Sequence, residues 1–397
     1  LCVLLVAYPI LMSELMVGRH KGLSAIESTA QLAKDSGKSA NWGIVGVVGV
    51  FGAFLLLTTY SVIAGQVMAF GVMSTTGGFS GGPGAGLYDG TLMPLLWHTI
   101  FMAMTIFVVA QGLHNGIERF VTILMPAFFV MLAGLCIYSL VNGASGQAVS
   151  YLFEPRFDEV TPSVVLAAMG QAFFSLSLGC ATMITYGTFL SRDENIASSG
   201  GLIAGSDTLV AVISGLMIFP IVFAFDLDPA QGFGLMFSAM PAVFTEMPGG
   251  AFIGATFFVL ALVAALTSAI SLLIVAAIAG QNYTGLGKAG SAIVFGGAVW
   301  LVGAATIFIS GLGANIDFFA NSIALPVGGL LVAILVGWVA PSAAMRGELP
   351  HASDRLFSAW RFLVRYVAPV AITITLILGL DQRFGFGLNR ALASLTG

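Results

Sequence analysis

Charged residues are scarce in this chain of 397 residues, because only 8% of its positions carry Asp, Glu, Lys or Arg. Soluble domains carry about 25%, so most of the surface must face something other than water. The mean hydropathy of +1.01 and the 58% share of hydrophobic residues point the same way. These values predict an all-α polytopic membrane protein.

Cysteine is also rare, and Cys2, Cys136 and Cys180 all lie in apolar stretches. This pattern argues against a disulfide framework and a zinc site. The sequence has no basic stripe, nucleotide loop or Ser-His-Asp arrangement, so it favours neither nucleic-acid binding nor an enzyme. The chain opens inside a hydrophobic run, with neither an initiating Met nor the marks of a signal peptide. We therefore expect one transmembrane transporter domain, 1–397, that is N-terminally incomplete.

Ten apolar segments are long enough to cross a bilayer. They fall at roughly 1–18, 43–73, 93–112, 119–141, 163–190, 199–225, 251–280, 290–311, 316–340 and 361–380. Gly, Pro and charged residues gather in the connectors between them, most clearly in the glycine-rich connector 74–92.

The fourteen basic residues distribute unevenly between the two sides of these segments. With the first connector inside, eleven lie inside: Arg19, Lys21, Lys34, Lys38, Arg119, Arg192, Lys288, Arg346, Arg355, Arg361 and Arg365. Arg156, Arg383 and Arg390 lie outside. Since basic residues concentrate on the cytoplasmic side, the first segment runs from outside to inside. An inside N-terminus would need one more span upstream.

Small polar residues interrupt the fifth segment at 170–180 (GQAFFSLSLGC). At mid-membrane depth this composition is typical of a broken helix that binds a solute or an ion. The seventh segment carries the adjacent hydroxyls of Thr267 and Ser268. These either bond back to their own helix or, with a freed carbonyl, suit a small hard cation such as sodium.

Three carboxylates fall at membrane depth, where each costs at least ~2.5 kcal/mol. Glu14 is either a helix-end residue, near headgroups or paired with Arg19, or a brace for unwound backbone. Asp207 is either an acid of a first helical turn or an ion-site carboxylate. Asp317 is either an N-cap or an outer gate charge.

Five blocks of the chain, in order, resemble the neurotransmitter:sodium symporter family, which has the LeuT-like inverted-repeat fold. They are residues 9–19 (PILMSELMVGR), Tyr60, 116–120 (GIERF) with Met125-Pro126, 170–180, and 266–268 (LTS). The resemblance implies that the ten segments are family helices 2–11. It also implies that the first helix, which in the family completes both sodium sites, is missing from the sequence.

The resemblance assigns roles to individual residues. It places at the substrate Tyr60, Phe174, Ser175, Ser177, Cys180, Ser268 and Leu272, with Phe174 as an aromatic lid. The first sodium ion takes Ser175 and Asp207, and the second takes Ala264, Thr267 and Ser268. Glu14, Gln171 and Asp317 support the broken helix or the outer gate.

The chain departs from the family pattern at several of these positions. Asp207 stands where many relatives have Asn, and Ala211 stands where others have an acid or a chloride-binding Ser. We therefore expect chloride-independent transport, with Asp207 supplying the negative charge and its protonation accompanying return of the empty carrier. Cys180 in place of Phe leaves room for a bulky apolar or aromatic substrate. Phe189 and Asn282 replace Tyr and Asp of the inner gate, which predicts a weaker gate.

The sequence thus predicts a sodium-coupled secondary-active symporter that imports a hydrophobic or aromatic L-amino acid by alternating access. Its partners are the amino acid, two sodium ions and the lipid bilayer. The short tail after the last segment resembles prokaryotic members, so we expect a multi-pass protein of the bacterial inner membrane. The alternatives are a proton-coupled carrier of another LeuT-fold family and a solute sensor that does not transport.

Overall fold

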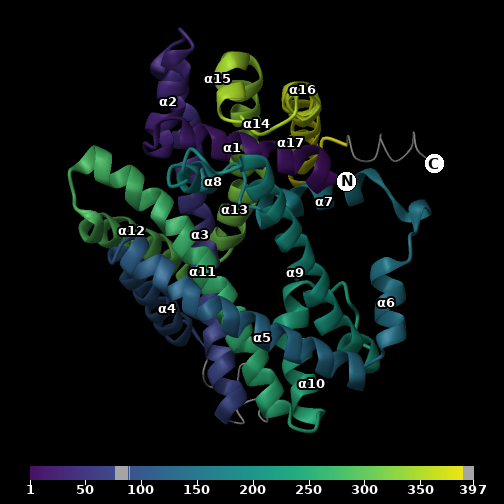
Figure 1. Cartoon of the computed structure of the whole chain (residues 1–397). Helices are drawn as coiled ribbons and strands as arrows, with labels where there is room; N and C mark the ends of the chain where they lie inside the picture. Colours follow the sequence, from purple (N-terminus) through teal and green to yellow (C-terminus); the bar gives the residue numbers. More distant parts are fainter. Residues whose placement is uncertain (77–87, 89, 388–397) are drawn as a thin grey trace.

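The computed structural model describes residues 1–76, 88 and 90–387 (Figure 1), and within this part of the chain every regular element is a helix. Arg390 and most of the connector 74–92 lie outside the described residues. Nine described helices are long and apolar enough to cross a membrane: Val3–Lys21, Ala40–Thr76, Leu92–Ala110, Gly116–Asn142, Ile196–Ala224, Gly250–Thr284, Lys288–Phe308, Leu312–Val339 and Asp354–Phe384. They match nine of the ten predicted segments.

The remaining predicted segment, the fifth at 163–190, is divided between two helices. α7 spans Pro162–Ser175 and α8 spans Thr182–Gly187. All ten segments are therefore helical, and the interruption falls within the polar stretch 170–180. The all-α polytopic architecture expected from the composition is confirmed.

Several membrane-crossing helices combine α-helical and π-helical stretches. The elements in chain order are η1 (Val3–Ala7), α1 (Tyr8–Lys21), α2 (Ala25–Asp35), η2 (Ala40–Gly43), α3 (Ile44–Thr76), α4 (Leu92–Ala110), η4 (Leu113–Glu118), α5 (Arg119–Asn142), α6 (Ser145–Phe153), η5 (Phe157–Glu159), α7, α8, α9 (Ile196–Ala224), η6 (Leu235–Ala239), α10 (Met240–Glu246), α11 (Gly250–Thr284) and α12 (Lys288–Phe308). Then follow α13 (Leu312–Phe319), η7 (Ala320–Ala324), α14 (Leu325–Ile334), η8 (Leu335–Val339), α15 (Ser342–Gly347), α16 (Asp354–Phe362), η9 (Leu363–Val367) and α17 (Ala368–Phe384).

The two longest helices, α3 and α11, pack against each other and form the centre of the bundle. Glycines let neighbouring backbones approach α3 closely, as small residues do in membrane bundles. A Cβ at Gly49 would lie 2.6 Å from the Cβ of Ala181, and one at Gly65 would lie 2.8 Å from the backbone N of His98. The contact at Gly49 fixes the start of α8 beside α3.

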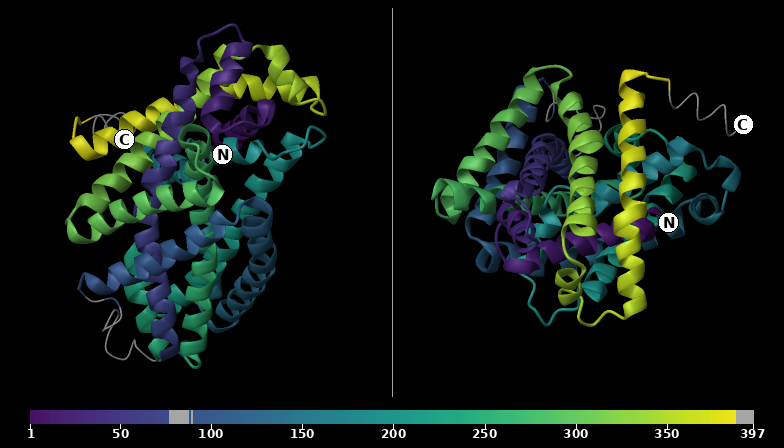
Figure 2. Two further views of the ribbon diagram at one scale, coloured as in Figure 1. Left: turned by 90° about the vertical axis from the view of Figure 1, so that its left-hand side faces the viewer. Right: turned by 90° about the horizontal axis from the view of Figure 1, so that it is seen from above.

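Three of the helices outside the membrane-crossing set, α2, α10 and α15, lie toward the ends of the bundle (Figure 1). Figure 1 shows α2 and α15 at one end and α10 toward the other. Arg19 and Arg192, predicted inside, both pair with Glu348 at the α2 end. Figure 2 shows α16 and α17 as one long rod along the outside of the bundle, where only 28% of the most apolar stretch is buried.

Candidate functional site

The break between α7 and α8 contains three residues in the left-handed backbone conformation. Ser177 has φ 52°, Gly179 has φ 77° and Ala181 has φ 59°. Two of these carry a Cβ, and such residues keep this conformation only where the surroundings hold them. The predicted interruption of the helix is therefore a specific backbone structure.

Two neighbouring helices hold the break in place. Glu14, wholly buried on α1, accepts a hydrogen bond from the Gly179 N–H at 2.7 Å. On the other side, a Cβ at Gly179 would lie 2.0 Å from the carbonyl oxygen of Leu325 on α14. A Cβ at Gly328 would in turn lie 2.0 Å from the carbonyl oxygen of Gly179. The break is packed without space for a side chain at either glycine, and Glu14 occupies the place of the predicted brace.

The alternative roles considered for the three acids are wrong. Glu14 is not near a helix end or paired with Arg19, because Arg19 Nε lies 3.0 Å from Glu348 Oε2. Asp207 lies about three turns into α9, and the dipole of a helix acts within its first turn. Asp317 lies inside α13, well after the start of that helix, so it is not an N-cap.

The two residues predicted for the first sodium site meet beside the break. Ser175 Oγ donates a hydrogen bond to Asp207 Oδ1 at 2.5 Å. Ser175 is the last residue of α7, and a helix C-terminus carries partial negative charge. Asp207 adds a carboxylate to this charge. The pair presents oxygen atoms and negative potential, the environment that a hard cation requires.

The three residues predicted for the second sodium site lie together on α11, but the Thr267 hydroxyl and the Ala264 carbonyl oxygen are hydrogen-bonded to each other. The Thr267 hydroxyl donates to the carbonyl oxygens of Val263 at 3.1 Å and Ala264 at 2.9 Å. α11 is continuous through this region, so the predicted freed carbonyl is not formed. Ser268 is exposed and interacts with the Tyr60 hydroxyl.

A contact that the sequence did not suggest lies one turn further along α11. The Tyr186 hydroxyl, on α8, is 2.7 Å from Ser271 Oγ, which donates to the Thr267 carbonyl at 3.0 Å. This contact connects the second half of the broken helix to the predicted second sodium site. The sequence does place Ser271 one helical turn after Thr267, but it gives no sign that Tyr186 is the partner of Ser271.

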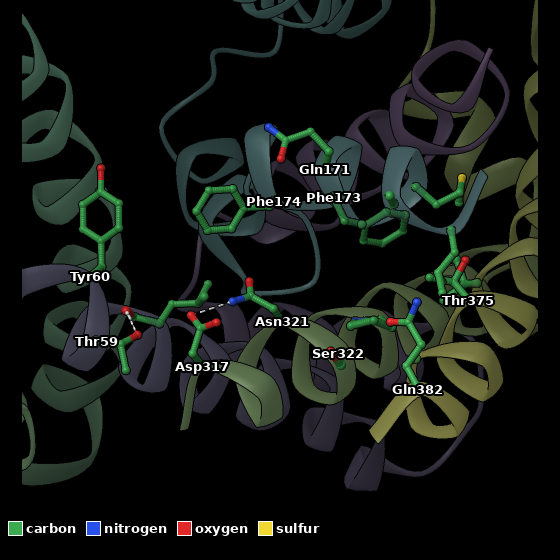
Figure 3. Close-up of a pocket in the computed structure, with 18 of the residues that line it drawn as sticks. Thr59, Tyr60, Gln171, Phe173, Phe174, Asp317, Asn321, Ser322, Thr375 and Gln382 are labelled. Carbon is green, nitrogen blue, oxygen red and sulfur yellow. Dashed lines mark hydrogen bonds between the residues drawn. The ribbon is translucent and has the colours of Figure 1, made fainter. Parts of the chain in front are cut away.

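A cavity of about 530 Å³ lies between α3, α7, α13, α14 and α17. Of the predicted residues, it is lined by Tyr60, Gln171, Phe174 and Asp317. Figure 3 shows Phe174 pointing from α7 toward the side where Tyr60 lies. Asp317 Oδ1 accepts a hydrogen bond from Asn321 Nδ2 at 2.9 Å, which adds a polar group to a mostly apolar wall.

The remaining predicted substrate residues lie away from this cavity. Ser175, Ser177, Ser268 and Leu272 are not among its lining residues. Cys180 is wholly buried, with Sγ 3.1 Å from the Ser177 carbonyl oxygen and 3.2 Å from Thr182 Oγ1. The expectation that Cys180 opens space for substrate is not met by the described cavity, because these contacts hold the thiol inside the break.

A comparison with models of protein families identifies the family of this chain. The model of the sodium:neurotransmitter symporter family matches residues 89–388. The chain belongs to this family. An uncharacterized sodium-dependent transporter of Bacillus subtilis is 32% identical over 396 residues, which are 94% of this chain and 87% of the relative. Another from Haemophilus influenzae is 27% identical, covering 96% and 89%.

Among solved structures, the crystal structure of MhsT in complex with L-phenylalanine superposes with a TM-score of 0.86. The two chains are 34% identical, and the match covers 95% of this symporter and 89% of MhsT. The symporter therefore has the LeuT-like fold predicted from the sequence. It is a sodium-coupled transporter and not an enzyme. Its membership of this family excludes the alternative of a carrier from another LeuT-fold family.

At the inner end of the symporter, a second cavity of about 540 Å³ contains both departures from the inner-gate pattern, Phe189 and Asn282. Asn282 Nδ2 donates to Glu27 Oε2 at 2.5 Å, and Ser24 Oγ donates to the same oxygen at 3.0 Å. Glu27 on α2 thus places a carboxylate beside Asn282.

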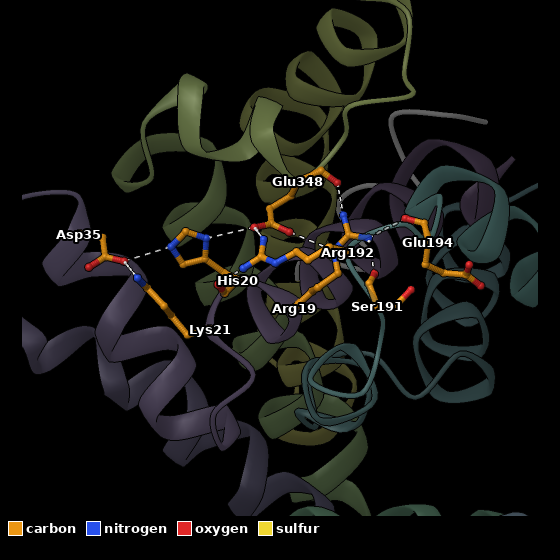
Figure 4. A network of polar contacts seen from close by, with 8 residues as sticks. All are labelled: Arg19, His20, Lys21, Asp35, Ser191, Arg192, Glu194 and Glu348. Atoms are coloured by element: carbon orange, nitrogen blue, oxygen red, sulfur yellow. Dashed lines mark hydrogen bonds and ion pairs between the residues drawn. The ribbon is translucent and has the colours of Figure 1, made fainter.

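A polar network lies beside this cavity, at the end of the bundle predicted to be cytoplasmic (Figure 4). Glu348, only 3% exposed, pairs with Arg19 Nε at 3.0 Å and Arg192 Nη1 at 2.7 Å, and it contacts His20 Nδ1 at 3.2 Å. Burial favours the neutral acid, but the hydrogen bonds from His20 and Arg19 and the charge of Arg192 outweigh it and lower the pKa of Glu348. His20 Nε2 also lies 3.1 Å from Asp35 Oδ2. The network ties α1 to α2, to the α8–α9 connector and to the loop after α15.

Proposed function

We propose that this symporter imports an apolar or aromatic L-amino acid together with sodium by alternating access across a bacterial inner membrane. The observation that carries the proposal is the contact of Ser175 with Asp207 at the end of α7. The negative end of a helix and a carboxylate meet there beside irregular backbone, and this arrangement favours a cation at the centre of the fold.

Two features support an amino acid as the second solute. MhsT, 34% identical to this symporter, was solved with L-phenylalanine bound. The break leaves backbone groups outside regular helix hydrogen bonding, as in transporters that bind a carboxylate and a cation at one site. We assign Phe174 and Tyr60 to closure over the substrate, because both face the cavity above the break.

The sodium stoichiometry belongs to the same proposal. We assign one ion to Ser175 and Asp207, and a second to Ala264, Thr267 and Ser268 after the Thr267 hydroxyl turns away from its own helix. Because binding of ions and substrate stabilises one state of the carrier, their affinities are coupled and the sodium gradient drives uptake.

Chloride independence follows from the charge of Asp207. Ala211, one turn further along α9, offers no hydroxyl to an anion, whereas the Asp207 carboxylate already balances the sodium charge. We expect uptake to continue when chloride is replaced by gluconate. Uptake that stopped in gluconate would contradict this assignment while leaving sodium coupling intact.

The experiment that tests the function measures thermal stabilisation of the full-length protein by each of the twenty amino acids, with sodium or potassium. Apolar or aromatic L-amino acids should raise the melting temperature in sodium only. Asp207→Ala should abolish the effect, whereas Asp158→Ala, at an exposed acid of the outer η5 turn, should preserve it. Stabilisation that is equal in potassium would overturn sodium coupling. Transport into proteoliposomes separates a symporter from a sensor.

A further inference from the structure

Two arginines on the rod formed by α16, η9 and α17 have no acidic partner among the described residues. Arg361 ends α16 and Arg365 lies on η9, one turn apart on the same face. No carboxylate lies within 4 Å of either guanidinium in the part of the chain that the structure describes. Arg361 Nη1 and Arg365 Nε are buried without a hydrogen-bond partner among the described residues. Arg361 Nη2 donates to the Ala340 carbonyl oxygen at 3.4 Å, but no described carboxylate balances the two positive charges. Such charges are costly without a counter-ion, so an anionic group from outside the chain is expected.

The acids nearest along the chain are already engaged. Asp354 Oδ1, at the start of α16, accepts from Arg346 Nη2 at 2.8 Å. Glu348 is held by Arg19 and Arg192. Positive charge therefore stays uncompensated at this corner of the inner face.

Two exposed aromatic rings lie against Arg365, and a third packs on one of them. Its guanidinium carbon lies 4.4 Å from the ring centroid of Trp338 and 5.6 Å from that of Tyr366. Phe362 packs on Tyr366 with centroids 5.5 Å apart. All three rings are exposed large side chains, and Trp and Tyr concentrate at the depth of lipid headgroups. The arginines are thus at headgroup depth, on the side that the basic residues mark as cytoplasmic.

An apolar stripe continues from Tyr366 into the membrane. Val370, Ile374 and Ile377 are exposed on α17, and their spacing places them on one face with Tyr366. The outward position of this rod is visible in Figure 2. A cationic, aromatic end and an apolar stripe are the complement of a single phospholipid molecule.

We propose that Arg361, Arg365 and Trp338 form a binding site for the phosphate of an anionic phospholipid, whose acyl chain lies along Val370 and Ile374. The lipid phosphate supplies the counter-charge that the described residues lack. A net negative headgroup is required, because a zwitterionic lipid brings its own cation to the two arginines. Basic pockets on the cytoplasmic side of membrane helices bind anionic headgroups in this way.

The test measures quenching of tryptophan fluorescence in phosphatidylcholine vesicles. The vesicles are doped with a lipid that carries brominated acyl chains, which is either phosphatidylglycerol or phosphatidylcholine. The full-length wild type should show stronger quenching by the brominated phosphatidylglycerol, and Trp338→Phe should remove the excess. Arg361→Gln with Arg365→Gln should weaken the preference about thirtyfold. Arg355→Gln, at an exposed arginine of the same helix that lies outside the cluster, should leave it unchanged.

Equal quenching of the wild type by the two lipids would overturn the proposal without any variant. An equal loss in Arg355→Gln and in the double variant would also overturn it, because it would reduce the effect to general surface charge. Inorganic phosphate is expected to leave the quenching unchanged. If phosphate abolished the preference, the cluster would be a site for soluble anions instead of lipid.

Discussion

The contact between Gly179 and Gly328 is the point at which a single methyl group tests the architecture of the break. A Cβ at Gly328 would lie 2.0 Å from the Gly179 carbonyl oxygen and 2.8 Å from its carbon. Both of those atoms belong to the backbone, so no flexible side chain can move aside. The Gly328→Ala variant must separate α14 from the break by more than about 1 Å, since ordinary contacts begin near 3.4 Å.

The cost can be worked out from the two positions separately. Overpacking of a methyl group in a tight core costs about 1–3 kcal/mol, and this is what we expect for Gly328→Ala. Gly179→Ala carries a similar overpacking cost, because its Cβ would lie 2.0 Å from the Leu325 carbonyl oxygen, and about 1 kcal/mol more because the glycine has φ 77°. Both changes push the break away from the start of α14, so the double variant should lose less stability than the sum of the single variants.

The assay is thermal unfolding of the full-length protein, with sodium titrated at each variant. Gly297→Ala on α12 is the matched control, because nothing lies within 4 Å of its Cβ position. Alanine is the better helix former by about 1 kcal/mol, so the control should be as stable as the wild type or more so. Gly328→Ala should be less stable and should bind sodium more weakly, because the displaced break carries Ser175. If Gly328→Ala matched the control in both measurements, the packing argument would be refuted.

Three further predictions concern other contacts. Glu348→Gln should cost about 3 kcal/mol, measured as a lower melting temperature, because it leaves Arg19 buried without a counter-charge. The pKa of Glu348 is lowered in the folded protein. Its ionised side chain therefore stabilises the fold above the unfolded pKa of about 4.3, and this stabilisation is lost as pH falls through the folded value. In that acid range the melting temperature of the wild type should fall more steeply with pH than that of Glu348→Gln. Tyr186→Phe should slow uptake while the variant remains folded, because it removes the hydroxyl that joins α8 to Ser271, and unchanged uptake would exclude that role.

The sequence was sufficient for the overall architecture and for the place of the break. Apolar length predicts the membrane segments, and the residues of 170–180 mark the interruption because Gly, Ser and Cys serve no purpose in a plain lipid-facing helix. The Ser175 and Asp207 side chains, 32 positions apart, come together through α7 and α9, and only the family resemblance predicted that pairing.

Other features depend on three-dimensional packing that no local pattern encodes. The Glu348 network joins Arg19, more than three hundred positions away, to a loop of ordinary polar composition. The Cys180 thiol lies inside the break, where it contacts Thr182 Oγ1 and the Ser177 carbonyl oxygen. The identity of the residue alone had suggested that it leaves space for the substrate. The compensation of Asn282 by Glu27 likewise requires the fold of α2 against α11.

The measurement that tests the central claim most directly is uptake of radiolabelled L-phenylalanine by proteoliposomes that contain the full-length symporter. An inward sodium gradient should drive accumulation above the external concentration, and a sodium ionophore should abolish it. Asp207→Ala should bind and accumulate nothing, whereas Asp158→Ala should behave as the wild type. Sodium-dependent binding without accumulation would identify a sensor, and accumulation that persists after the sodium gradient is dissipated would contradict sodium coupling.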